Sequence, residues 1–292
     1  MKVSIVLPAK NESAAIGDTV KGIFEHCPDA EVIVVNDGST DSTAELARGV
    51  GASVVSHPYS KGNGAAIKTG ARAATGDVIV FMDGDGQHDP ADITRLLARL
   101  GEGHDLVVGA RQNGSQASIG RGLANGFYNK LASFMTGHRI EDLTSGFRAV
   151  RADKFREFLY LLPNGFSYPT TSTMAFFRAG YSVTYVPIHA AQRLGKSHIK
   201  PLSDGMRFLL IIFKIGTLYS PLKLFAPVSV LAFLMATLWY GYTLTFEGRF
   251  TNMSALLYTG SVMIFMMGLI SEQITALMYK DTGRTSGLKP GE

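Results

Sequence analysis

The 292-residue chain contains one cysteine, one tryptophan and no long run of lysine or arginine. The single cysteine, Cys27, excludes an internal disulfide framework and is typical of a reducing compartment. Charged residues make up only 18% of the chain, and the formal net charge is +4. The lack of a strongly basic tract argues against nucleic acid as a partner, whereas a mild positive charge suits an anionic substrate or lipid surface.

The N-terminus lacks the apolar core of a signal peptide. Residues Val3 to Pro8 form an apolar run that is too short for such a core. We therefore expect the amino terminus to stay in the cytosol.

Two segments near the C-terminus, 224–246 and 250–271, contain no charged residue. A helix needs about 20 apolar residues to cross a bilayer. The sequence therefore predicts two transmembrane helices, at about 224–246 and 250–272, joined by the short connector 247–249. A pair of buried core helices is the alternative, but two such runs in tandem are uncommon in soluble domains.

Basic residues lie on one side of this predicted hairpin. Lys214 and Lys223 precede it and Lys280, Arg284 and Lys289 follow it, whereas the connector contains only Arg249. The positive-inside rule then places both ends in the cytoplasm. We expect a multi-pass protein of the cell (inner) membrane with its catalytic domain on the cytoplasmic side.

The segment before the hairpin is apolar with sparse charges. It fits interfacial helices lying on the lipid headgroups, or a helix packed on the soluble domain, and the sequence leaves both open. The predicted divisions are a catalytic domain at 1–200, juxtamembrane helices at 201–222, a hairpin at 223–280 and a cytoplasmic tail at 281–292.

The first 200 residues alternate short apolar runs with helical stretches. Strands are predicted at 3–7, 32–35, 53–56, 78–82 and 106–109, and helices at 12–25, 42–49, 63–74 and 90–100. Asp41 or Ser42 is the expected N-cap of the second helix, and Asp89 that of the fourth. This alternation predicts an α/β fold, with a mainly parallel sheet covered by helices on both faces.

Polar clusters follow three of the predicted strands. They are the segments 8–12, 36–41 and 83–90. Ligands of parallel sheets bind at the carboxyl ends of the strands, so these clusters are expected to form one site. Each cluster taken singly is also an ordinary turn sequence.

The third cluster has the pattern of a site for a hard cation. Asp83, Asp85 and Gln87 alternate, and their oxygens suit Mg²⁺ or Mn²⁺, which also bridge to phosphates. An EF-hand loop would need an acidic residue at Thr94. A haloacid dehalogenase-type phosphatase would place its Asp-x-Asp near the start of the domain, and three strand–helix units come first here.

The segments 3–12, 36–41 and 82–90 resemble family 2 glycosyltransferases of the GT-A (Rossmann-like) fold. More narrowly, the chain resembles the polyprenyl-phosphate branch, which includes dolichyl-phosphate mannose synthase and its bacterial relatives. The resemblance covers residues 1 to about 200, and a C-terminal membrane hairpin is common in that branch. It implies an inverting transferase that uses a nucleotide-sugar, Mg²⁺ or Mn²⁺, and a polyprenyl phosphate.

The resemblance assigns the donor site residue by residue. It implies that Pro8, Ala9 and Glu12 line the nucleotide pocket, Asp37 contacts the base, and Asp83 lies near the ribose or diphosphate. Asp85 and Gln87 would bind the metal. Lys61 matches the family's Lys-Gly segment, whose glycines would let the backbone approach the nucleotide, although a helix-entry turn also explains them.

The resemblance also assigns an acceptor site. Arg111 and Arg121 match arginines that bind the acceptor phosphate, a role that suits the planar guanidinium. Asp142 and Ser145 lie in the family's Asp-x-x-Ser-Gly-Phe segment. An aspartate in this region is the general base of relatives with hydroxyl acceptors. A phosphate acceptor is already ionised near neutral pH, so Asp142 would instead orient the acceptor or balance the arginines.

A last segment, 192–198, resembles the mobile loop that closes over the donor diphosphate, and its expected contacts are Arg193 and Lys196. The spacing departs from the family's pattern, because Arg193 is one residue closer to the glycine and His198 replaces a lysine. Lys200 is therefore a further candidate for this contact.

The sequence thus predicts transfer of a hexose from GDP-mannose or a UDP-sugar to a membrane polyprenyl phosphate. A processive polysaccharide synthase is the nearest alternative, but the Gln-x-x-Arg-Trp pattern of those enzymes is absent. A catalytically silent membrane scaffold on the same fold is another, and the intact metal motif argues against it. The sequence leaves the sugar and the formation of a homo-oligomer open.

Overall fold

A computed structural model of the chain describes residues 1–111, 119–165, 167–189, 216–217 and 219–280, without the side chains of 119–125, 127, 279 and 280. The chain divides into two compact units, Met1–Lys200 and Pro201–Glu292.

The first unit is built on a seven-stranded sheet with the strand order β3-β2-β1-β4-β6-β5-β7. Its strands are β1 (Val3–Ala9), β2 (Glu31–Asn36), β3 (Ser53–Ser56), β4 (Val78–Phe81), β5 (Leu106–Arg111), β6 (Arg148–Arg151) and β7 (Val183–Ile188). Strand β6 runs antiparallel to its neighbours β4 and β5, and the other pairs are parallel.

The mainly parallel sheet and the five predicted strands are confirmed, and β6 and β7 are additions. Because β1, β2 and β4 are parallel neighbours, their carboxyl ends lie together at one edge. Strand β6 brings residues 142–147, which precede it, to the same region of the sheet.

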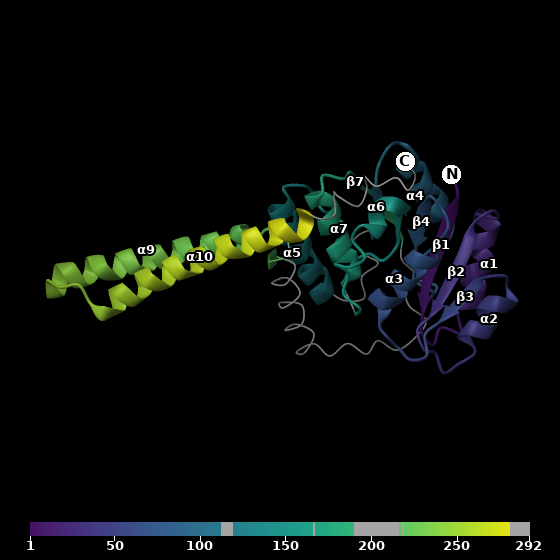
Figure 1. The fold of residues 1–292 in the computed structure, drawn as a ribbon, viewed down its shortest axis with the longest axis horizontal. Helices are drawn as coiled ribbons and strands as arrows, with labels where there is room; N and C mark the ends of the chain where they lie inside the picture. The colour runs from purple at the N-terminus through teal and green to yellow at the C-terminus, as the bar shows by residue number, and fades with distance from the viewer. Residues whose placement is uncertain (112–118, 166, 190–215, 218, 281–292) are drawn as a thin grey trace, which may run out of the picture. The chain divides into compact units, whose positions relative to one another are not determined.

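Helices cover both faces of this sheet (Figure 1). They are α1 (Ile16–His26), α2 (Thr43–Gly49), α3 (Asn63–Ala73), α4 (Asp92–Gly101), α5 (Ile119–Thr136), α6 (Ala152–Arg156) and α7 (Tyr168–Arg178). On one face, Leu7 and Val34 pack with Ile16 of α1 and Ile93 of α4. On the other, α3 approaches so closely that a Cβ on Gly70 would lie 2.2 Å from a methyl carbon of Val6.

The predicted helix starts were too early at two positions. Helix α1 begins at Ile16 rather than Glu12, and α4 begins at Asp92 rather than at Pro90. The carboxylate of Asp89 accepts a hydrogen bond from the Ala91 amide at 2.9 Å, in a turn that precedes α4. Ser42 occupies the N-cap of α2 without a side-chain hydrogen bond, and Asp41 accepts from the Thr43 amide instead.

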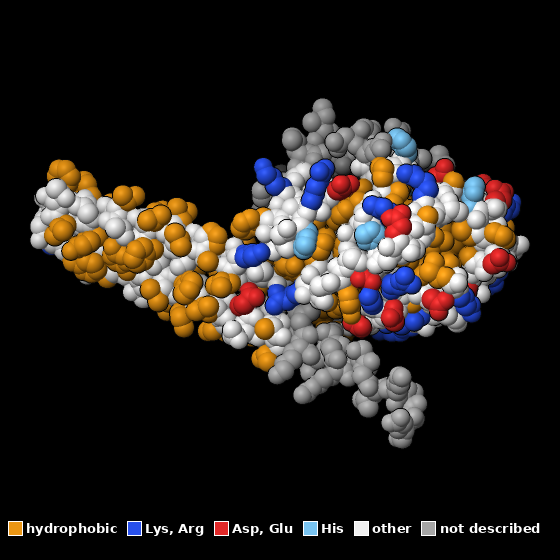
Figure 2. All heavy atoms as spheres, turned by 90° about the horizontal axis from the view of Figure 1, so that it is seen from above, with side chains coloured by type: hydrophobic (Ala, Val, Ile, Leu, Met, Phe, Trp, Pro, Cys, Tyr) orange, Lys and Arg blue, Asp and Glu red, His pale blue; other side chains and the backbone are white. Residues whose placement is uncertain are grey.

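The described part of the second unit is a helical hairpin of α9 (Pro221–Glu247) and α10 (Asn252–Lys280). Gly248 ends α9 with a φ of 65°, and its amide donates to the carbonyl oxygen of Leu244. By length and composition both helices can cross a membrane. Figure 2 shows their surface densely covered by hydrophobic side chains. The predicted juxtamembrane helices lie largely outside the described residues.

Candidate active site

The loops that follow β1 and β2 are held together by hydrogen bonds. The Asp37 amide donates to the carbonyl oxygen of Ala9 at 2.9 Å. Asn11, at a φ of 55°, accepts from the Thr40 amide at 2.8 Å, and its own amide donates to Ser39 Oγ at 3.0 Å. Asparagine tolerates this left-handed backbone better than most residues. The first two polar clusters therefore form one surface.

The loop that follows β4 packs against the same surface. A Cβ on Gly84 would lie 3.4 Å from the Pro8 carbonyl oxygen and 3.5 Å from Ala9 Cβ. The structure therefore brings Pro8, Ala9, Asp37, Asp83 and Asp85 to one edge of the sheet. This placement matches the rule that sites of parallel sheets lie at the carboxyl ends of the strands.

Two further predicted donor residues lie at this edge. The amide of Glu12 donates to Thr43 Oγ1 at 2.9 Å, which ties the loop after β1 to the start of α2. Lys61 is exposed, and its ammonium lies 5.7 Å from the centre of the Tyr59 ring.

The Asp37 carboxylate accepts four hydrogen bonds. Oδ1 accepts from His57 Nδ1 at 2.7 Å and from the Lys61 amide at 2.8 Å, and Oδ2 accepts from Ser60 Oγ at 2.7 Å and the Gly62 amide at 2.9 Å. Burial alone would raise the pKa of Asp37, but these bonds outweigh it and lower the pKa to about 2. The hydrogen bonds of the Asp37 carboxylate are therefore with the segment 57–62.

The glycines after Lys61 serve packing within the chain. A Cβ on Gly62 would lie 2.5 Å from the Asn164 carbonyl oxygen, and one on Gly64 would lie 2.0 Å from that of Pro163. The Gly64 amide also donates to the carbonyl oxygen of Gly165 at 3.1 Å. Of the two explanations that the sequence offered, the helix-entry turn at the start of α3 matches these contacts.

The Asp83–Gln87 segment has local order of its own. The Gln87 amide donates to Asp85 Oδ1 at 3.2 Å, and Asp83 Oδ2 lies 3.7 Å from Nε2 of His88. The His88 ring packs on Phe147 at a centroid distance of 5.0 Å. A Cβ at residue 146 would lie 3.0 Å from Asp83 Oδ2, so Gly146 allows the segment before β6 to reach this carboxylate.

Arg111, which is partly buried, and Asp142, which is buried, form a bidentate ion pair. Arg111 Nε donates to Asp142 Oδ2 at 2.7 Å and Nη2 donates to Oδ1 at 3.0 Å, while Nη2 also donates to Thr144 Oγ1. The amides of Thr144 and Ser145 donate to Asp142 Oδ1 as well. Burial would raise the pKa of Asp142, but the Arg111 bonds and charge lower it below its ordinary value. The Asp142 carboxylate thus neutralises the positive charge of Arg111.

The structure shows less about the other predicted acceptor residues. Ser145 is buried, and its hydroxyl makes no hydrogen bond within the described part of the chain. Arg121 lies on α5, and its side chain falls outside the described residues. The donor-loop candidates Arg193 and Lys196, with Lys200, also lie outside them.

Sequence reasoning missed a buried cation next to this site. Arg148, the first residue of β6, is fully buried and has no carboxylate salt-bridge partner among the described residues. Its guanidinium donates to the carbonyl oxygens of Ser145 and Pro169 and to the hydroxyls of Ser172 and Thr173. Burial lowers its pKa. The only sequence signal was an arginine that opens an apolar strand directly after Gly146-Phe147.

Solved structures of glucosyl-3-phosphoglycerate synthase share this architecture. Glucosyl-3-phosphoglycerate synthase of Mycobacterium tuberculosis, solved with Mn²⁺, UDP and glucosyl-3-phosphoglycerate, is 26% identical, with a TM-score of 0.59 over 73% of this chain and 78% of that chain. Its complex with phosphoglyceric acid has a TM-score of 0.60 at 23% identity, over 73% of this chain and 79% of that chain, and shows the fold alone. The sheet and its helices therefore have the GT-A fold.

Family models match both units of the chain. Residues 4–159 match glycosyl transferase family 2, and residues 220–277 match the GtrB C-terminal hairpin. The chain belongs to glycosyl transferase family 2 and is a glycosyltransferase. This confirms the family resemblance found in the sequence.

Two curated relatives are glycosyltransferases. Glycosyltransferase AglJ of Haloferax volcanii is 28% identical over 98% of each chain. The undecaprenyl-phosphate 4-deoxy-4-formamido-L-arabinose transferase of Salmonella paratyphi B is 32% identical over 66% of this chain and 60% of that protein. The similarity to AglJ therefore spans both units.

Proposed function

We propose that this glycosyltransferase transfers a hexose from GDP-mannose or a UDP-sugar to a membrane polyprenyl phosphate, with inversion at the anomeric carbon. A phosphate oxygen of the acceptor attacks the anomeric carbon, and the nucleoside diphosphate leaves. The product is a polyprenyl-phosphate sugar. The reaction takes place on the cytoplasmic face of the cell membrane.

The ion pair between Asp142 and Arg111 is the main observation in support of a phosphate acceptor. A hydroxyl acceptor needs a base that removes its proton, and a base needs a pKa near the working pH. The pKa of Asp142 is instead lowered, and its oxygens accept bonds from Arg111 and from two backbone amides. A phosphate acceptor is already ionised, so this arrangement favours a phosphate nucleophile.

The hairpin supports a lipid acceptor. Its two helices are long and apolar enough to cross a membrane, and large side chains such as Leu238 and Phe246 are about three-quarters exposed, at 75% and 74%. The Salmonella relative is named as an undecaprenyl-phosphate sugar transferase. A polyprenyl phosphate combines the required phosphate with a chain that dissolves in the bilayer.

The donor set at the strand ends fits Mg²⁺ or Mn²⁺. The carboxylates of Asp83 and Asp85 and the side-chain oxygen of Gln87 are hard ligands. The backbone N–H of Gln87 donates to Asp85 Oδ1 and so helps to hold that carboxylate in place. The described residues gather no cluster of three His, Cys, Asp or Glu, so substrate and water oxygens would complete the coordination. Mg²⁺ is commonly held in this way. The bound ion would supply charge neutralisation for the departing diphosphate.

The remaining roles divide between donor and acceptor. Pro8, Ala9 and Glu12 line the nucleotide pocket with Lys61 at its rim, and Asp37 holds the segment 57–62 in place beside it. Arg193 and Lys196 contact the donor diphosphate. Arg111, Arg121 and Ser145 belong to the acceptor side.

Lipid extraction after incubation with labelled donors tests this function. Membranes that contain the full chain are incubated with labelled GDP-mannose, UDP-glucose and a UDP-N-acetylhexosamine, with and without a chelator. We expect one donor to label a prenyl-phosphate lipid, and chelation to abolish the labelling. Asp85→Ala should lower transfer by on the order of 100-fold or more, since even outer-shell changes cost 10- to 100-fold.

Asp89→Ala serves as the matched control for Asp85→Ala. Asp89 is exposed and lies in the same loop, where its carboxylate accepts a hydrogen bond from the Ala91 amide. Transfer that survives Asp85→Ala would rule out the metal site. Labelled product that appears only in a water-soluble fraction would rule out the lipid acceptor.

A further inference from the structure

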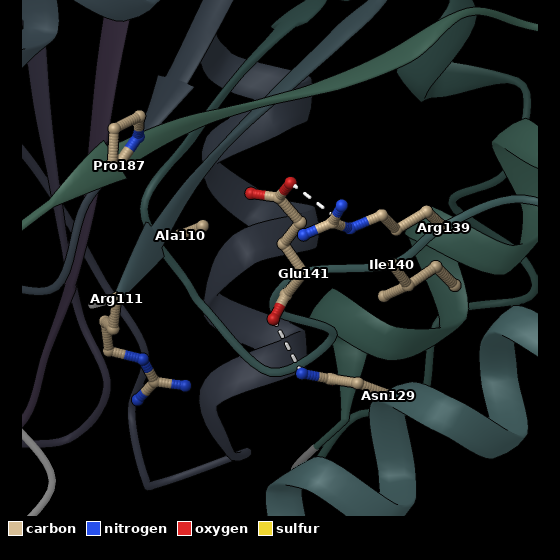
Figure 3. A pocket seen from close by; sticks show the side chains of 7 residues that line it. All are labelled: Ala110, Arg111, Asn129, Arg139, Ile140, Glu141 and Pro187. Atoms are coloured by element: carbon tan, nitrogen blue, oxygen red, sulfur yellow. Dashed lines mark hydrogen bonds and ion pairs between the residues drawn. The ribbon is translucent and has the colours of Figure 1, made fainter. Parts of the chain in front are cut away.

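An open pocket of about 450 Å³ lies beside the ion pair of Arg111. It is lined by residues of β5, α5, β7 and the segment that follows α5, namely Ala110, Arg111, Asn129, Arg139, Ile140, Glu141 and Pro187. Figure 3 shows Arg111 and Arg139 entering the pocket from opposite sides, with the Glu141 carboxylate near Arg139. Two guanidinium groups therefore border one cavity.

The two arginines differ in how firmly they are neutralised. Arg111 is held by Asp142 at 2.7 and 3.0 Å, and the Asp142 side chain is only 8% exposed. Arg139 Nε lies 3.7 Å from Glu141 Oε1, beyond hydrogen-bond range, and the Arg139 side chain is 88% exposed. An exposed pair of this kind contributes little. Of the two cations that line the pocket, Arg139 is therefore the one whose carboxylate partner an incoming anion can replace.

Glu141 is anchored through its backbone rather than its carboxylate. Asn129 Nδ2 donates to the Glu141 carbonyl oxygen at 2.6 Å, and Asn129 Oδ1 accepts from the Leu143 amide at 3.1 Å. These bonds fix residues 141–143 on α5. The Glu141 side chain can therefore swing away from Arg139 while the wall of the pocket remains in place.

We propose that this pocket binds the phosphate monoester of the acceptor, with Arg139 as a binding cation and Glu141 as its internal competitor. The incoming phosphate replaces the Glu141 carboxylate on Arg139. The inference rests on the proposed function, because it assigns a binding residue to the acceptor of that reaction.

Charge and geometry favour a phosphate here. Arginine donates in a planar fork that matches phosphate oxygens, and a dianionic phosphate attracts Arg139 more strongly than one carboxylate does. The pocket also lies near the donor site, because Arg111 lines it and binds Asp142. Four residues after Asp142, a Cβ on Gly146 would lie 3.0 Å from Asp83 Oδ2. A phosphate held between Arg139 and Arg111 would therefore lie beside the reacting donor.

Steady-state kinetics of the full chain in a non-ionic detergent test the proposal. Farnesyl phosphate is the acceptor probe, and the labelled donor that the wild type accepts is held at saturation. Arg139→Ala should raise the KM for farnesyl phosphate about tenfold, the factor that corresponds to roughly 1.4 kcal/mol and one charge-assisted hydrogen bond. Glu141→Gln should lower that KM about two- to threefold, because the competing charge is gone. Neither variant should change the KM of the donor.

Arg99 and Glu102 provide the matched control. They form an exposed ion pair on and just after α4, and neither lines the pocket. Arg99→Ala and Glu102→Gln should leave the KM for farnesyl phosphate unchanged. Thermal melting of all four variants shows that each is folded.

Several outcomes would overturn the proposal while leaving the function intact. An unchanged KM in Arg139→Ala, or a raised KM in Glu141→Gln, rules out the assignment if the wild type transfers sugar to farnesyl phosphate. An effect of Arg139→Ala that appears only in vesicles with anionic lipid makes Arg139 a membrane contact and also overturns it. A wild type that transfers to no prenyl phosphate would instead sink the proposed function itself.

Discussion

In the sheet domain the large apolar side chains lie inside, whereas in the hairpin they are the most exposed. Ile5, Leu7 and Phe81 have no exposed surface, but Leu238 and Leu256 are 75% and 66% exposed. Apart from Pro221, the buried positions among the described residues of the two helices belong instead to small residues, namely Ser229, Ala236, Thr243, Ser254, Ser261, Gly268 and Thr275. Small residues let helices approach closely in lipid, where apolar side chains gain nothing by turning inward.

Both regions nevertheless bury hydroxyl groups. In the hairpin, Ser229 Oγ donates to the Ser261 carbonyl oxygen at 2.8 Å and joins α9 to α10. In the domain, residues 170–173 of α7 are all buried hydroxyl residues, and two of them accept from Arg148. The buried polar groups of the hairpin thus serve packing, whereas those of the domain surround a charge beside the active site.

Arg148→Met gives the largest effect that this comparison predicts. We expect transfer to fall by about 10- to 100-fold, as for residues that orient a site through their neighbours. The unfolding free energy should change by less than about 1 kcal/mol, because the lost hydrogen bonds are offset by relief from burying an unpaired charge. Transfer assays and thermal melting of the full chain measure both quantities.

The conservative variant Arg148→Lys separates this positioning role from a loss of structure. Arg148→Lys keeps the charge and should retain more transfer than Arg148→Met at equal stability. A large loss of stability in Arg148→Met, with activity lost in proportion, would show that the polar interior of the domain serves packing as the hairpin's does.

Asp37→Asn is the next largest predicted change. The pKa of Asp37 is about 2 in the folded chain and 3.8 ordinarily, so its hydrogen bonds contribute about 2 kcal/mol of stability. Because the folded pKa is depressed, this contribution is fully present above pH 4 and is lost as the pH falls towards 2. The difference in unfolding free energy between wild type and variant should narrow over that range.

Melting curves at several pH values check the Asp37 prediction, with Asp29→Asn as the control, because Asp29 is exposed. A different result is expected if Asp37 binds the nucleotide base and does not stabilise the fold. The variant would then melt like the wild type at pH 7, and only the KM of the nucleotide-sugar would rise.

Much of the fold could be predicted, because its signal is local. The five predicted strands are apolar runs between turn residues, and the hairpin follows from two stretches without charge. Strand β6 was missed because it has four residues with arginine at both ends. Such a strand is defined by its neighbours β4 and β5 rather than by its own pattern.

The candidate site was less predictable, because side-chain partners come from distant segments. The loop after β4 could be placed from its strand, but the four bonds on Asp37 come from residues 20 to 25 positions further along. The partners of Arg148 lie up to 25 residues away on α7. The sequence around Asp37 or Arg148 does not indicate whether the side chain binds a ligand or forms hydrogen bonds with another part of the chain.

Two glycines of α10 give the smallest predicted effect and the sharpest test of how the hairpin packs. A Cβ on Gly268 would lie 2.8 Å from Phe225 Cβ of α9, whereas one on Gly260 would meet nothing within 4 Å. Gly268→Ala should therefore lower stability by about 1 kcal/mol, the low end of overpacking costs, and Gly260→Ala should leave it unchanged or slightly raised. Thermal melting in detergent measures both. Phe225→Ala combined with Gly268→Ala should recover part of the loss if the two residues meet. Equal effects of the two glycine variants would mean that close approach of α9 and α10 does not hold the hairpin together. The hairpin would then differ from the sheet domain only in its exposed apolar side chains.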